Sequence, residues 1–222
     1  MKPIGLLSAA FAAMLTVACG GDANHDRPAA NDTAAVGTAG EGANPNANAD
    51  ADKNNVSNGT RDWIEDRLVG GMTEVKLGEL ASQKAQNADV KAFGRMMVQD
   101  HTKAGNELKQ IATQHNIQAP AQLDDEHRDK VDRLSKLQGA EFDREYMNQM
   151  VDDHQNTLEA VEDRVEKQGS DENPTYTPKQ NDNRVDMAVN QWAAKTAPTV
   201  HKHHMRAKQL NDKIGRRTTD NR

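Results

Sequence analysis

Apolar residues recur at steps of three or four through most of the chain after residue 60. This spacing places them on one face of a helix, so the pattern predicts long amphipathic helices. The four long predicted helices span about residues 60–86, 87–115, 140–168 and 184–214. A shorter amphipathic helix is expected at about residues 124–137, inside the connection between the second and third long helices.

Four long helices of this kind predict an all-α fold, a four-helix bundle, and the connection between the second and third helices allows a ferritin-like arrangement. The connection between the second and third helices is more than 20 residues long, which is enough to cross the whole bundle. Such a crossover would make these two helices parallel. Pro198 is expected to kink or break the last helix. Residues 169–183 are polar, hold two prolines and are expected to form a loop.

A five-residue phrase occurs twice, once on the second and once on the third predicted helix. It reads Met-Val-Gln-Asp-His at residues 97–101 and Met-Val-Asp-Asp-His at residues 150–154. In both copies the methionine and the histidine are four residues apart and share one helix face. The fourth helix also carries a histidine, His203, on its apolar stripe. Each phrase therefore belongs either to a packed core or to the lining of a site.

One hypothesis is a metal site at mid-bundle. His101, His154, His203 and Glu74 lie on four different helices and can converge on one point. Such a site suits a transition metal, with copper, zinc or iron as the candidates, because imidazole binds these ions well. The further residues assigned to it are Met97 and Met150 as soft ligands, and Asp100, Asp153, Asp143 and Tyr146 as surrounding hydrogen-bond partners.

The alternative is a structural polar core. In that case the histidines would hydrogen-bond to Glu74, Asp143, Tyr146 or backbone carbonyls and would set the register of the helices. The sequence leaves both interpretations open. His201 and His204 are three residues apart and could chelate a metal at the surface, but a solvated helix face is the preferred interpretation.

Enzyme chemistry has little support in the sequence. Ferritin-like di-iron proteins carry Glu-x-x-His motifs, whereas valine stands three residues before each of the three histidines. No nucleophile elbow and no phosphate-binding glycine loop is present. No catalytic residue is therefore assigned, and a redox enzyme is the weakest hypothesis.

The N-terminal residues predict export. Lys2 precedes an apolar segment at residues 4–18, and Cys19, the single cysteine, follows directly. This arrangement resembles the lipobox of bacterial lipoproteins, which implies a signal peptide at residues 1–18 and a lipid on Cys19. Because Gly20 and not aspartate follows the cysteine, the resemblance favours the outer membrane, facing the periplasm, over the inner membrane.

The remaining domain boundaries follow from composition. Residues 19–59 are rich in Ala, Asn, Asp and Gly and are expected to be a disordered tether, since they offer little surface to bury. The bundle is expected at residues 60–215 and a disordered tail at 216–222. The formal net charge of −6 and the 3% aromatic content argue against nucleic acid as a partner. The membrane is the expected partner, and the sequence identifies no protein partner.

Four motifs, one on each long helix, resemble a known family. They are Met-Thr-Glu-Val and Leu-Gly-Glu-Leu-Ala within residues 72–81, Val-Lys-Ala-Phe-Gly-Arg-Met-Met-Val-Gln-Asp-His-Thr at 90–102, Gly-Ala-Glu-Phe-Asp-Arg-Glu-Tyr at 139–146, and Ala-Pro-Thr-Val at 197–200. Together they are similar to the bacterial domain-of-unknown-function 4142 family. The resemblance implies an exported ferritin-like bundle and no established activity.

These observations give three ranked hypotheses. The first is a non-enzymatic envelope lipoprotein with a binding or stress-associated role. The second is a transition-metal-binding module built on the mid-bundle histidines. The third is a redox enzyme.

Overall fold

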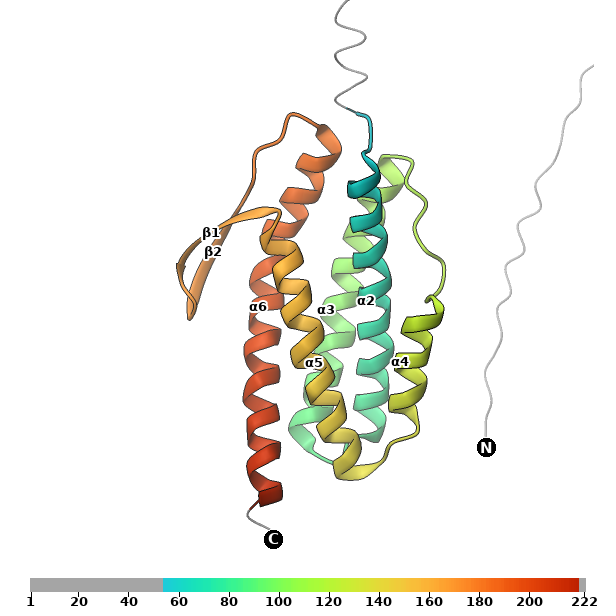
Figure 1. The fold of residues 1–222 in the computed structure, drawn as a ribbon, viewed down its shortest axis with the longest axis vertical. Helices are drawn as coiled ribbons and strands as arrows, with labels where there is room; N and C mark the ends of the chain where they lie inside the picture. The colour runs from blue at the N-terminus through green and yellow to red at the C-terminus, as the bar shows by residue number, and fades with distance from the viewer. Residues whose placement is uncertain (1–53, 220–222) are drawn as a thin grey trace, which may run out of the picture. The chain divides into compact units, whose positions relative to one another are not determined.

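The structure is a computed structural model that describes residues 54–219. The predicted signal peptide (1–18), Cys19 and the predicted tether as far as residue 53 lie outside the described residues. The elements of the described part are α2 (Asn58–Lys84), α3 (Ala88–Gln114), α4 (Asp125–Ser135), α5 (Gly139–Glu162), β1 (Val165–Ser170), β2 (Asn173–Pro178) and α6 (Arg184–Thr219). The helices pack side by side, which confirms the predicted all-α bundle class (Figure 1). No helix in residues 54–219 combines the length and apolar character needed to span a membrane.

Side-chain caps fix where the first helices begin. Ser57 accepts a hydrogen bond from the backbone nitrogen of Thr60 at 3.0 Å, so α2 begins at Asn58. Asn87 accepts from the backbone nitrogen of Asp89 at 2.8 Å, so α3 begins at Ala88. Only residues 85–87 separate α2 from α3, which makes these two helices antiparallel neighbours (Figure 1).

The long connection reverses the chain direction once more. Asp143, in the first turns of α5, accepts hydrogen bonds from the backbone nitrogens of Gln86 (3.0 Å) and Asn87 (2.7 Å). The starts of α3 and α5 therefore lie at the same end of the bundle, and the two helices run parallel (Figure 1). The segment between them returns along the bundle and places α4 against α2.

Two glycines allow α2 and α3 to approach closely. A Cβ atom built on Gly78 would lie 2.6 Å from the carbonyl oxygen of Gly94, and one on Gly94 would lie 2.7 Å from that of Gly78. Any larger side chain would force the two backbones apart. This contact fixes the spacing of the two helices near the histidine of α3.

The segment after α5 differs from the prediction. The expected third helix continues to residue 168, but α5 ends at Glu162, and β1 and β2 form an antiparallel hairpin where a loop was expected. The physical reason is that β1 is almost entirely exposed and carries no apolar alternation. Its register comes from pairing with β2 across a tight turn at residues 171–172. Near the end of β1, Gly169 adopts a φ of +90° that suits glycine.

Pro198 does not end α6. The helix continues on both sides of this residue and extends to Thr219, beyond the residue 214 expected from the pattern and into the expected tail at 216–222. Proline removes one backbone donor. Ala197 and Val200 on either side are buried in the core, and this packing offsets the lost hydrogen bond.

The core of the bundle consists of two separate apolar clusters. One lies toward the β-hairpin and includes Ile64, Leu68, Leu108, Val161, Val189 and Trp192. The other lies toward the opposite end and includes Leu77, Phe93, Met97, Tyr146, Met150 and Leu210. On every long helix the two sets of residues are separated along the sequence by a stretch that contains buried or partly buried polar residues.

Candidate metal centre

A polar layer separates the two apolar clusters. It includes one residue from each long helix that the sequence singled out: Glu74, His101, His154 and His203. Glu74, His154 and His203 are buried, with exposed fractions of 5%, 1% and 2%, and His101 is partly buried. The parallel course of α3 and α5 brings the two copies of the repeated phrase to the same depth.

The three histidines form one compact group. The distances between their ring centroids are 5.4 Å for His101 and His154, 5.5 Å for His101 and His203, and 5.4 Å for His154 and His203. One ring nitrogen from each residue lies within 4.8 Å of the other two. Phe93, a member of the apolar cluster with Met97 and Met150, packs edge-on against His154 and His203 at 6.3 and 6.4 Å, so the histidine group borders this cluster directly.

Hydrogen bonds fix the tautomers of two of these rings. Nδ1 of His154 donates to the carbonyl oxygen of Met150 at 2.9 Å, because a carbonyl can only accept. Nε2 of His203 donates to the carboxylate of Asp100 at 2.9 Å. In each ring the other nitrogen therefore carries a lone pair. Metal-binding histidines are commonly held in this way, with one nitrogen bonded to a carbonyl or carboxylate and the other directed at the metal.

The nitrogens left over are buried without partners. Nε2 of His101, Nε2 of His154 and Nδ1 of His203 have no hydrogen-bond partner among the described residues. A buried polar atom without a partner costs about 1–3 kcal/mol. Nε2 of His154 and Nδ1 of His203 carry lone pairs, and His101 can present a third lone pair at Nε2 in the tautomer that is protonated at Nδ1. A cation would satisfy all three.

The environment also keeps the three rings uncharged. Burial lowers the pKa of His101 to about 3, and His203 adds to this effect. The pKa of His154 is lowered well below its usual value by burial first and by its histidine neighbours second. Burial lowers the pKa of His203 too, against the opposite effect of Asp100. Neutral imidazole is the form that binds metal ions.

Glu74 lies beside the group but not within it. Its Oε1 is 3.8 Å from Nδ1 of His154, the nitrogen that bonds to Met150, and its Oε2 is buried without a partner in the described part of the chain. Burial raises the pKa of Glu74 well above its ordinary value, and Asp153 adds to this. Tyr146 also has a buried hydroxyl without a partner there, and burial raises its pKa, with a smaller effect from Glu74.

The other assigned residues lie in different surroundings. Met97 and Met150 belong to the apolar cluster below the group, and Met150 contributes its carbonyl oxygen. Asp100 bonds to His203, whereas Asp153, its counterpart in the repeated phrase, pairs with Lys130 at 3.0 Å. Asp143 caps the start of α3 at the end of the bundle.

His201 and His204 do not lie on a solvated helix face. Their exposed fractions are 8% and 7%, so the preferred interpretation of these two residues was wrong. The reason is that α6 packs against both α3 and α5, which covers more than one of its faces. These histidines are not members of the group of three.

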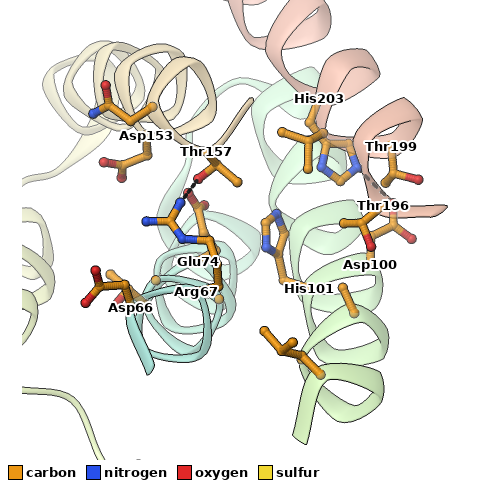
Figure 2. Close-up of a pocket in the computed structure, with 18 of the residues that line it drawn as sticks. Asp66, Arg67, Glu74, Asp100, His101, Asp153, Thr157, Thr196, Thr199 and His203 are labelled. Atoms are coloured by element: carbon orange, nitrogen blue, oxygen red, sulfur yellow. Dashed lines mark hydrogen bonds and ion pairs between the residues drawn. The ribbon is translucent and has the colours of Figure 1, made fainter. Parts of the chain in front are cut away.

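A cavity of about 230 Å³ adjoins the histidine group (Figure 2). His101 and His203 form part of its wall, together with polar residues that the sequence interpretation did not assign to a site: Arg67, Thr157, Thr196 and Thr199. Arg67 is two turns before Glu74 on α2 and Thr157 is one turn after His154 on α5. Because residues three or seven positions from a site residue lie on the same helix face, this spacing could have identified Arg67 and Thr157 from the sequence.

Comparisons with known proteins locate the chain within a family. No curated protein and no solved structure matches it. The family model described as "Domain of unknown function (DUF4142)" matches residues 45–174, a range that includes His101 and His154 and ends before α6 and His203. Because this match covers more than half of the chain, the protein belongs to the DUF4142 family.

Proposed function

We propose that this protein binds a single transition-metal ion, copper or zinc, through His101, His154 and His203. The observation that carries the proposal is the set of three buried ring nitrogens without partners, one from each residue, at one level of the core. Zinc and copper sites with three histidine ligands leave a fourth position open for water or another ligand.

The distances fit such an ion after small movements. Nitrogens bound to a tetrahedral ion at about 2.0–2.1 Å lie about 3.3 Å apart. One ring nitrogen from each histidine lies within 4.8 Å of the other two, and rotations of the rings about their side-chain bonds would close a gap of this size.

The donor set also favours certain ions. Copper and zinc accept imidazole ligands readily, while calcium and magnesium prefer oxygen. A di-iron centre needs several carboxylate ligands, and no carboxylate belongs to the group of converging atoms. Monovalent copper would suit the buried site well, because a single charge costs less to remove from water than a double charge.

The structural polar core is the competing interpretation. A core network selected for stability would leave its members with hydrogen-bond partners. Here each histidine keeps one buried nitrogen unpaired, and Glu74 and Tyr146 each keep a buried oxygen unpaired in the described residues. These unpaired buried atoms support a binding site in which a bound ion interacts with them.

The predicted lipid anchor gives the proposal a cellular setting. A lipid on Cys19 and the tether that follows would hold the metal-binding bundle in the cell envelope, at the outer membrane facing the periplasm. The proposed role there is binding of the metal ion and not catalysis.

The test is metal retention by the untagged chain. The protein is stripped with a chelator, exposed to equimolar copper or zinc, passed through a desalting column and analysed for metal. We expect about one ion per chain, and its loss in the His101→Ala, His154→Ala double variant. The matched control is His201→Ala, His204→Ala, two buried histidines outside the group, which should retain the ion. Retention of no metal, or equal losses in both double variants, would refute the proposal.

A further inference from the structure

The cavity beside the histidine group is kept open by glycines. Gly70 and Gly71 on α2 and Gly105 on α3 line it, and a Cβ atom at any of the three would meet no atom within 4 Å. Gly71, His101 and Gly105 also line a second, more open hollow between α2, α3 and the segment that leads into α4. The missing side chains therefore leave both room for a ligand and a short route to it from outside.

The wall of the cavity offers a cation opposite the histidines. Arg67 donates to Thr157 at 3.5 Å, and its Nε is buried with no hydrogen-bond partner among residues 54–219 (Figure 2). Thr157 is one turn beyond His154 on α5, which places Arg67 about 5 Å along the bundle axis from the level of the histidines. Thr196 and Thr199 on α6 add hydroxyl groups to the wall of the cavity (Figure 2).

We infer that this cavity binds a small carboxylate or bicarbonate-like anion, with one oxygen on the fourth coordination position of the metal ion and the other on Arg67. The inference rests on the metal site proposed above and adds the class of ligand that the site takes. A guanidinium pairs well with a planar anion of this kind, because its nitrogens can bind two oxygens in one plane. The cavity volume of about 230 Å³ accommodates an anion of a few heavy atoms.

The charges around the cavity make binding depend on the metal. Asp66, Asp100 and Asp153 also line it, and the cations among the lining residues are Arg67 and Lys130. Lys130 is paired with Asp153 at 3.0 Å, so it is engaged before any ligand enters. Without a metal ion the acidic groups oppose an anion, and with the ion bound the balance becomes favourable.

The experiment is a calorimetric titration of acetate into the full chain loaded with the zinc or copper ion that it retains. Acetamide, which has the shape of acetate without its charge, is the ligand control. We expect saturable binding of acetate, at least tenfold weaker binding in Arg67→Met, and unchanged binding in Arg95→Met, which removes an exposed arginine on α3. Formate and bicarbonate titrations then distinguish carboxylates from inorganic carbonate as the preferred source of the anion.

A second variant guards against a purely structural effect of Arg67. Gly70→Leu fills the cavity without altering Arg67 or any histidine, and it should weaken acetate binding at least tenfold while one metal ion per chain is retained. If the loaded chain retains its ion but binds no anion, or if Arg67→Met and Gly70→Leu bind acetate as tightly as the wild type, the inference is wrong and the metal site stands. If the metal-free chain binds acetate equally well, the bridging arrangement is wrong. A failure to retain metal removes both proposals.

Discussion

Nε2 of His203 on α6 donates a hydrogen bond of 2.9 Å to the carboxylate of Asp100 on α3. Asp100 directly precedes His101 in the repeated phrase, yet it positions the histidine of a different helix. This bond holds His203 in the tautomer that leaves Nδ1 unprotonated, and Nδ1 is the nitrogen without a partner in the described structure. One aspartate thereby ties α3 to α6 at the level of the site.

Asp100→Asn should weaken metal binding by about 10- to 100-fold, because an amide holds the ring less firmly and makes it less basic than a carboxylate does. Competition with a chromophoric chelator measures the change. The control is Asp153→Asn, at the same position of the second phrase, where the partners are Lys130 and Gln149 and not a histidine. Equal losses in the two variants would show that Asp100 has no specific role.

His101→Leu should abolish metal binding and leave the metal-free fold as stable as before, within about 1 kcal/mol, or more stable. Replacing a buried polar group that lacks a partner by an apolar side chain of similar size removes a desolvation cost. Chemical denaturation with a chelator present gives the free energy of unfolding. A structural role for the histidine group predicts the opposite, a loss of more than about 2 kcal/mol.

Acidification should destabilise the metal-free protein through its histidines. The pKa of His101 is about 3 in the folded chain and near the ordinary 6.5 in the unfolded chain, so between these values only the unfolded state takes up this proton. Protonation of His101 therefore does not reduce the free energy of unfolding above about pH 6.5. Below this pH it lowers the free energy of unfolding by about 1.4 kcal/mol per pH unit, down to about pH 3. The pKa values of His154 and His203 are shifted in the same direction.

Glu74 acts in the opposite sense. Because its pKa is raised, the folded state keeps a proton that the unfolded state releases above about pH 4.5. The contribution of Glu74 to the free energy of unfolding therefore decreases as the pH rises. A difference between variants isolates His101 from this effect. When the pH is lowered from 7.5 to 5, the free energy of unfolding from denaturant titrations should fall by about 2 kcal/mol less in His101→Leu than in the wild type. Parallel pH profiles for the two proteins would contradict the burial of an uncharged His101.

Two kinds of glycine on α2 should respond oppositely to alanine. Gly78→Ala should destabilise the fold by about 1–3 kcal/mol, because its Cβ would meet the carbonyl oxygen of Gly94 at 2.6 Å. Gly70→Ala should stabilise it by about 0.5–1 kcal/mol, because the new methyl group meets nothing within 4 Å and alanine favours the helix. Thermal unfolding of the two variants measures both changes. A similar effect of the two substitutions would show that the close α2–α3 contact is not present.

The bundle and the depth of the histidines follow from sequence pattern. Helical spacing of apolar residues identified the helices, and the long connection allowed the parallel α3 and α5 that bring His101 and His154 to one level. The hairpin after α5 was missed because its polar strands, β1 and β2, gain stability from pairing with each other and not from an apolar face.

The finer arrangement of the site depends on helix rotation and side-chain torsions, which a pattern of spacing does not contain. Glu74 was expected as a fourth ligand, and it lies beside the far nitrogen of His154 instead of among the converging atoms. The bond from His203 to Asp100 crosses between helices, so no spacing within one helix reveals it. The open cavity near Arg67 results from glycines on two helices that meet only in three dimensions.

X-ray absorption spectroscopy of the copper- or zinc-loaded chain tests the central claim most directly, because it reports the ligands of the ion itself. The metal-site geometry predicts three histidine nitrogens at about 2.0–2.1 Å from the ion, with at most one or two further oxygen or sulfur ligands. The same spectrum of the His154→Ala variant should lose the signature of three imidazoles. A coordination shell of oxygen ligands, or one with fewer than two histidines in the wild type, would contradict the account.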